Sequence, residues 1–285
     1  MVLNNPVKMK TKLISIISGL IFFTSVSSAQ VFDKVGSDIG NFLKVGGSVF
    51  TAPFNFDSGD WTNFAITTGA VGGAFFLDNT ARKFSQQDHT NFKNDLFDID
   101  QYYKTQYAVI ATAGIYGVGL LINNDRLRNV GLQLGESLIY AGIVTVTLKS
   151  LIGRSRPYTQ RGHSDFHPFS VSDDKVSFPS GHATVAFAFS TVMAHQVDNI
   201  FWKAGWFGAA GLVCYARLYH DRHWVSDVIM GGAVGYFIGR LVVNHPTNNP
   251  SQKEISEKKN KPVYSVGVNL RENQPVYTLN FGYQF

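Results

Sequence analysis

The sequence predicts an all-α protein, a bundle of about six core helices that carries a C-terminal β-hairpin. The apolar runs are longer than strands and lack the period-two alternation of a strand. Apolar residues make up 45% of the 285 residues and charged residues 16%, against about 25% charged in soluble domains. Alternation appears only at the C-terminal end. A chain of this length is long enough to bury a full core.

Six apolar runs predict the core helices, at 61–77, 105–124, 130–152, 181–196, 201–219 and 224–243. The first is free of charge for 17 residues and the second for 20, and about 20 residues span a bilayer. The later runs are shorter between charges. An exported site also requires an even number of crossings before it, so one early run would be re-entrant or merely packed. We expect a membrane-associated helical domain, and a soluble helical bundle is the open alternative.

The first 29 residues have the pattern of a secretory signal peptide. Three lysines precede an apolar run at 13–23, and small residues end the segment at Ser27-Ser28-Ala29. An uncleaved anchor is the alternative, although the run is short for a span. Cleavage would lower the formal charge from +5 to +2. The excess of basic over acidic residues therefore does not indicate nucleic-acid binding. We expect a protein of the bacterial cell envelope with a periplasm-facing site, either membrane-associated or integral.

The rest of the chain divides by composition. We expect a short amphipathic helix followed by a loop at 30–60, the helical domain at 61–244, a polar linker at 245–261 and the hairpin at 262–285. An isolated hairpin is marginally stable, so we expect this one to pack on the helical domain or to pair with another subunit in an oligomer. Cys214 is the single cysteine, which excludes an intrachain disulfide, and we expect it to be a small core residue.

Three clusters between Lys149 and Asp227 carry candidate chemistry. The first is Lys149 with Arg156-Pro157. The two cations are two helical turns apart and would share one face if the helix continued through Gly153. Alone, this pattern is also that of a solvated basic helix end.

The second cluster is Pro179-Ser180-Gly181-His182, directly before an apolar run. Ser180 can cap the helix and Gly181 allows close backbone approach. Free amides at a helix N-terminus bind phosphate, and His182 in the first turn would face the same anion. The alternative is an ordinary cap with an exposed histidine.

The third cluster is Arg217, His223 and Asp227. A carboxylate four residues after a histidine can reach the ring on a helix, fix its tautomer and leave the other nitrogen free to attack. Two alternatives remain, a structural His–Asp pair and a metal site that adds His220. The arginines and the lysine nearby favour an oxyanion site over a metal.

The order and spacing of all three parts resemble the signature of the type-2 phosphatidic acid phosphatase and vanadium haloperoxidase superfamily. The signature covers 149–227, and the helical runs extend the similarity to 61–243. The chain has Ala216 where the family usually has a serine before the arginine, which removes one possible hydroxyl contact to phosphate.

The resemblance implies a metal-independent phosphatase that works through a phosphohistidine. His223 would be the nucleophile, Asp227 would orient it, and His182 would protonate the leaving alkoxide and then help to activate water. The phosphate would be bound by Lys149, Arg156, Ser180, Gly181 and Arg217. No cofactor is implied, and vanadate would act as a phosphate mimic or inhibitor.

The substrate expected from the apolar runs is a lipid phosphate or diphosphate, with a small phosphate ester as the alternative. A soluble periplasmic acid phosphatase of broad specificity, a vanadate-dependent haloperoxidase and a non-catalytic envelope scaffold that docks through the hairpin remain open. Vanadate would inhibit a phosphatase but activate a peroxidase. His223→Ala would leave the phenotype of a scaffold unchanged.

Overall fold

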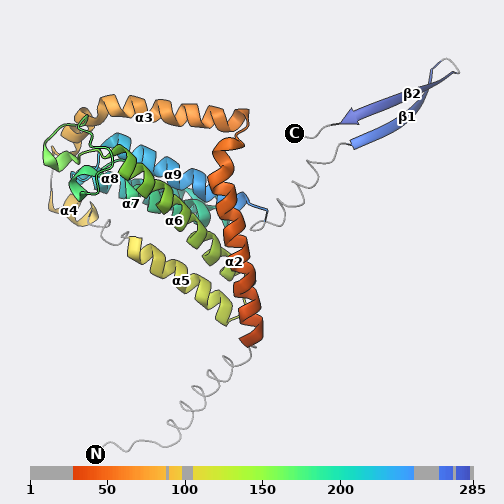
Figure 1. Ribbon diagram of the computed structural model, residues 1–285, viewed down its shortest axis with the longest axis horizontal. Coiled ribbons are helices and arrows are strands. Elements are labelled where there is room, and N and C mark those ends of the chain that lie inside the picture. The colour runs from red at the N-terminus through yellow and green to blue at the C-terminus, as the bar shows by residue number, and fades with distance from the viewer. Residues whose placement is uncertain (1–27, 88–89, 98–104, 247–262, 272–273, 283–285) are drawn as a thin grey trace, which may run out of the picture. The chain divides into compact units, whose positions relative to one another are not determined.

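The computed structural model describes residues 28–87, 90–97, 105–246, 263–271 and 274–282 (Figure 1). Contacts divide the chain into two units, Met1–Val242 and Val243–Phe285. The described part of the chain contains eight α-helices: α2 (Ser28–Thr51), α3 (Ser58–Ser85), α4 (Asn91–Phe97), α5 (Thr105–Leu121), α6 (Asp125–Ile152), α7 (Gly181–His195), α8 (Ile200–Tyr219) and α9 (Val225–Asn244).

The all-α class is confirmed, and the six predicted core helices correspond to α3 and α5–α9. Two further helices lie outside these six. α2 falls mainly in the 30–60 segment, where a short helix was expected, and α4 was not predicted. α4 lies in a polar stretch without a clear apolar period, which is why the sequence did not predict it. Its last residue, Phe97, is buried and packs against Tyr215 and Tyr219 of α8.

The segment between α2 and α3 also differs from expectation. A short helix and a loop were expected up to residue 60, but α2 is 24 residues long and α3 already begins at Ser58. Asp57 explains the early start. Its carboxylate accepts from Asp60 N at 2.8 Å, and Asp60 Oδ2 accepts from Asp57 N at 3.3 Å. This reciprocal capping box starts a helix at residues that otherwise favour a turn.

Glycines on one face of α9 allow it to pack closely against α7. A Cβ added at Gly231 would lie 2.3 Å from Ser180 O, and one at Gly235 would lie 2.3 Å from Thr184 O. Gly239, one turn further, meets the same helix at Thr191. Small residues at intervals of four let two helix backbones approach. The contact begins at the N-terminal ends of both helices, where the candidate site residues lie.

The main core of the first unit lies between α6, α7 and α9. It contains Leu138, Ala141, Val185, Ala188 and Val234. The helix α2 is tied to this bundle by a buried charge pair, since Asp38 accepts hydrogen bonds from Tyr116 Oη at 2.8 Å and from Arg128 Nη1 at 3.1 Å. A paired and hydrogen-bonded carboxylate is the form in which charge is tolerated in an interior.

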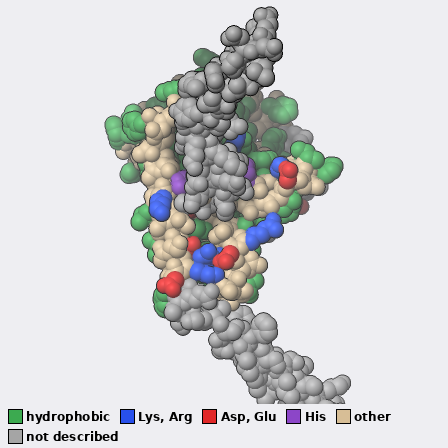
Figure 2. Space-filling view, turned by 90° about the vertical axis from the view of Figure 1, so that its right-hand side faces the viewer, with side chains coloured by type: hydrophobic (Ala, Val, Ile, Leu, Met, Phe, Trp, Pro, Cys, Tyr) green, Lys and Arg blue, Asp and Glu red, His purple; other side chains and the backbone are tan. Residues whose placement is uncertain are grey.

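Two helices, α6 and α9, are long and apolar enough to cross a membrane by length and composition. The sequence instead singled out the runs that form α3 and α5. Large apolar side chains are exposed on several helices, including Phe76 (83%) and Phe201 (83%). On the face in Figure 2, hydrophobic side chains are exposed at the margins and charged side chains gather in separate groups.

The second unit contains the strands β1 (Val263–Arg271) and β2 (Gln274–Gly282). They pair antiparallel, with Val263 opposite Gly282 and Arg271 opposite Gln274. The predicted signal peptide lies outside the described residues except for its last two, which open α2, and the predicted linker lies outside them from residue 247 onward.

Candidate active site

The three sequence clusters lie at one end of the helices α6–α9. Lys149 is in the last turn of α6 and Arg217 in the last turn of α8. His182 is in the first turn of α7, and Asp227 is in the first turn of α9. Because these helices alternate in direction, two C-termini and two N-termini meet at the same end (Figure 1). The long loop between α6 and α7 lies at this end.

Gly153 separates the first two cations, so the condition for their sharing one helix face, a helix continuing through Gly153, is not met. It has φ +62, and its N–H donates to Lys149 O at 2.9 Å, so α6 stops at Ile152. This left-handed cap is the conformation that glycine adopts without strain. A Cβ here would also meet His167 O. Arg156 therefore lies in the loop, and Lys149 in the helix.

The loop also places both cations. Lys149 Nζ donates to Val176 O at 2.5 Å, and a Cβ added at Gly181 would lie 3.8 Å from Lys149 Cε, so the lysine lies beside the N-terminus of α7. Arg156 donates from Nε to the carbonyl and from Nη2 to the carboxylate of Asp173, both at 2.7 Å. The Asp173 side chain is 76% exposed.

Ser180 is the N-cap of α7, as predicted, and accepts from Ala183 N at 3.4 Å. It is fully buried, and its own N–H donates to Asp227 O at 2.9 Å. This backbone bond joins the N-terminus of α7 directly to the first turn of α9. The second and third clusters are thereby held together.

His223 and Asp227 form the centre of the site. His223 Nδ1 lies 3.6 Å from Asp227 Oδ2 and 3.4 Å from Ser177 Oγ. Asp227 Oδ2 also accepts from Ser177 Oγ at 2.5 Å and from Trp224 N at 2.9 Å. The Nδ1 side of the ring thus faces the carboxylate, which leaves Nε2 as the other reactive position.

Burial and four positively charged or basic neighbours lower the pKa of His223 well below its usual value of 6.5. Burial is the larger cause, since a desolvated ring resists protonation. The neighbours that add to the effect are Lys149, Arg156, Arg217 and His182. The charges of the predicted cations and of the second histidine thus add to the effect of burial, and the lowered pKa favours the neutral form of the ring.

His220 does not join His223 and Asp227. Its Nε2 lies 3.2 Å from Phe97 O, so it faces α4. Among the residues that the structure describes, no group of three His, Cys, Asp or Glu side chains is placed to hold a metal ion.

Sequence reasoning missed three residues around Asp227. Ser177 bonds its Oδ2, and Arg154 Nη1 bonds its Oδ1 at 2.6 Å. Asp78 in α3 accepts from Arg154 Nη2 at 2.6 Å. Arg154 lies two residues before the signature arginine, and Asp78 is the first charge after an uncharged run. Only the fold shows that these positions meet.

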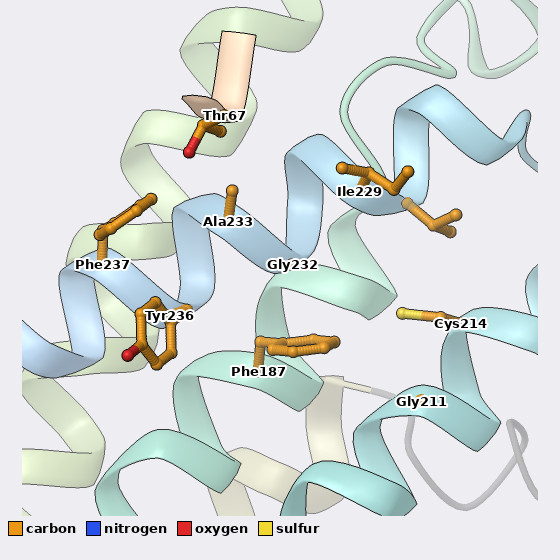
Figure 3. A pocket seen from close by; sticks show the side chains of 10 residues that line it. Thr67, Phe187, Gly211, Cys214, Ile229, Gly232, Ala233, Tyr236 and Phe237 are labelled. Carbon is orange, nitrogen blue, oxygen red and sulfur yellow. The ribbon is translucent and has the colours of Figure 1, made fainter. Parts of the chain in front are cut away.

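An apolar groove of about 440 Å³ lies along α9. Figure 3 shows that side chains of α3, α7 and α8 surround it together with one face of α9. Its lining includes Thr67, Phe187, Cys214, Val228, Ala233 and Phe237. Val228 follows Asp227 in the sequence, but none of the predicted site residues lines the groove. Cys214, expected in the core, is half-buried and lines this groove.

Part of the chain is similar to known proteins. The model of the PAP2 superfamily matches residues 130–251. Lipid A 1-phosphatase from Rhizobium johnstonii is 32% identical over 114 residues, which are 39% of this chain and 46% of that protein. An undecaprenyl-diphosphatase from Sulfolobus acidocaldarius is 28% identical over 47% of this chain and 64% of its own length. The chain thus spans about half the length of these relatives.

The crystal structure of a transmembrane PAP2-type phosphatidylglycerolphosphate phosphatase from Bacillus subtilis also resembles the chain. The similarity covers 79% of this chain and 96% of that one, at 19% identity and a TM-score of 0.45.

Proposed function

This chain belongs to the PAP2 superfamily, and we propose that it is a phosphatase that removes phosphate from a membrane lipid through a phosphohistidine intermediate. The observation that carries the proposal is the buried His223 with Asp227 on its Nδ1 side, and its pKa is lowered by burial and by the charges of Lys149, Arg156 and Arg217. A neutral imidazole has a free lone pair, and cations nearby disfavour its protonation. Such a ring is therefore better suited to attack a phosphate than to act as a proton donor.

The first step forms the phosphoenzyme. His223 Nε2 attacks phosphorus, and the bond from phosphorus to the lipid oxygen breaks. His182 donates its proton to the departing oxygen. The ring of His223 becomes positive as the bond forms, and the Asp227 carboxylate beside Nδ1 stabilises that charge.

The second step releases phosphate. Water attacks phosphorus, His182 accepts its proton, and the nitrogen–phosphorus bond breaks with return of the electron pair to His223. Throughout, the phosphate oxygens are held by Lys149, Arg156, Arg217, Ser180 and the Gly181 amide. Phosphoryl transfer depends mainly on positioning and on neutralising charge, and these groups supply both without a metal or cofactor.

The apolar groove supports a lipid substrate. Its lining follows α9, the helix that carries Asp227 in its first turn, from Val228 to Phe237. Its lining is almost entirely apolar, so a hydrocarbon chain gains free energy by leaving water or by entering from a bilayer. We assign the groove to the chain of the substrate, whose phosphate or diphosphate then reaches His223. Lipid A and undecaprenyl diphosphate, on which the relatives act by name, are the first candidates.

We further propose that the protein is embedded in the cell envelope with the site on the periplasmic side. The support is the apolar length of α6 and α9, the exposed apolar side chains of several other helices, and the signal-peptide pattern. The domain boundaries expected from composition, and pairing of subunits through the hairpin, remain part of this proposal.

The test is phosphate release by the full chain in detergent from lipid A, undecaprenyl diphosphate, phosphatidate and a soluble aryl phosphate. Wild type should turn over at least one lipid faster than the soluble ester, and vanadate should inhibit it. His223→Ala should lose at least about a thousandfold in kcat. Equal rates on soluble and lipid substrates would refute the lipid assignment, and normal turnover by His223→Ala would refute the mechanism.

A further inference from the structure

A buried chain of charges lies behind Asp227. Arg154 and Asp78 are both fully buried, with no exposed side-chain surface. The Arg154 guanidinium spans two carboxylates, that of Asp227 at 2.6 Å through Nη1 and that of Asp78 at 2.6 Å through Nη2. Its Nε donates to His163 O at 2.7 Å. Arg154 thus has fixed partners on three sides.

Ser226 completes the connection between the two carboxylates. Its hydroxyl accepts from Arg154 Nη1 at 2.7 Å and donates to Asp78 Oδ2 at 2.7 Å. Its backbone N–H donates to Asp78 Oδ1 at 2.9 Å. Asp78 therefore forms hydrogen bonds both to Arg154 and to the first turn of α9, which carries Asp227.

The two carboxylate oxygens of Asp227 bind different partners in this arrangement. Oδ1 is bound by Arg154, whereas Oδ2 is bound by Ser177 Oγ and Trp224 N and faces His223. With Oδ1 anchored, the carboxylate cannot rotate away from the ring. Bonds of this kind to charged groups are shorter and stronger than neutral ones.

The charges also suit the proposed reaction. Asp78, Arg154 and Asp227 together carry one net negative charge in a buried place, which is costly unless it is compensated. The ring of His223 supplies the compensating positive charge when it is phosphorylated. Without Asp78, the positive charge of Arg154 would offset the negative charge of Asp227. Less negative charge would then remain to stabilise the positive ring of phosphorylated His223.

We propose that Arg154 and Asp78 are positioning residues for phosphoryl transfer, which aim Asp227 at His223 and preserve its negative charge. The inference rests on the proposed function. It implies that α3 contributes a residue to the active site, although α3 lies outside the residues 130–251 that match the family model.

The experiment compares Arg154→Gln, Asp78→Asn and the double variant in the full chain. Each single variant should lose about 10- to 100-fold in kcat, the size typical of losing an outer partner of a functional group, while KM changes much less because the phosphate-binding cations are intact. Arg154→Gln also leaves two buried carboxylates without their cation, so its melting temperature should fall. The double variant should regain melting temperature but not kcat.

Arg82→Gln is the matched control. Arg82 lies in α3 one turn after Asp78 and pairs with Asp221 through two bonds of 2.7 Å, so its loss also loosens α3. It should keep wild-type kcat. Recovery of kcat together with melting temperature in the double variant, or an equal loss in Arg82→Gln, would show a merely structural role and overturn the inference. An active wild type with unchanged single variants would overturn only this inference, whereas an inactive wild type would overturn the proposed function with it.

Discussion

Ser180 N donates to the carbonyl oxygen of Asp227 at 2.9 Å, and this bond joins the starts of α7 and α9. The glycine face of α9 continues the same contact for two further turns. The placement of His223 relative to the α7 amides that we propose to bind phosphate therefore depends on how closely two helix backbones approach.

Substitution of Gly235 tests that dependence. A Cβ at this position would lie 2.3 Å from Thr184 O and 2.7 Å from Ala188 N, which are backbone atoms that cannot give way alone. We expect Gly235→Ala to destabilise the protein by about 1–3 kcal/mol and to lower kcat. Thermal unfolding and phosphate release measure the two effects.

Gly208→Ala in α8 is the control for this prediction, because no atom lies within 4 Å of the added Cβ. It should keep its activity and gain up to about 1 kcal/mol from the better helix propensity of alanine. Similar losses in both variants would contradict the role given to the α7–α9 contact.

The second prediction concerns Asp227. With the carboxylate replaced by an amide, His223 loses the charge that stabilises its phosphorylated ring. We expect Asp227→Asn to lower kcat by about 10³- to 10⁴-fold, as the same change does beside the histidine of a serine protease. Steady-state kinetics with a lipid phosphate measure the effect. A fall of less than tenfold in a folded variant would contradict the orientation role.

The third prediction is the pH dependence set by His223. Its pKa is lowered below 6.5 by burial and by cations, so the nucleophile stays neutral as pH falls through 6.5. The acidic limb of kcat/KM should therefore lie below pH 6.5. The charged and titratable groups that face the ring are Lys149 from α6, Arg156 from the loop, His182 from α7, Arg217 from α8 and Asp227 from α9.

The same shift predicts a stability effect. Below pH 6.5 the unfolded chain protonates this histidine and the native protein does not, so native stability falls as pH falls. His223→Gln cannot titrate and should lose less stability over this range. Parallel pH dependence of the melting temperatures of the two proteins would contradict the assignment.

The fourth prediction concerns the apolar groove. Ala233 lines it, and Ala233→Trp should fill it with side chain. We expect KM for a long-chain lipid phosphate to rise while KM for a soluble phosphate ester stays unchanged. Ala113→Trp, at an exposed position of α5, is the control. An equal effect of Ala233→Trp on both substrates would contradict the assignment of the groove to the lipid chain.

The sequence predicted the six core helices and the three clusters because local patterns encode them. Long apolar runs give helices, and Ser180 before a run gives a cap. The predicted helix 130–152 ends where α6 ends, but the sequence left open whether a helix could continue through Gly153 to Arg156, because a glycine can also continue a helix at a modest cost. Nor did it show that Asp78 reaches Arg154, 76 residues away, since such a contact depends on how α3 docks.

The most direct test is to trap the phosphoenzyme. Full-length protein is mixed with a ³²P-labelled lipid phosphate, quenched, and its labelled peptide is mapped. The proposed mechanism predicts alkali-stable, acid-labile label on His223 in wild type and none in His223→Ala. Label on another residue, or full turnover by His223→Ala, would contradict it.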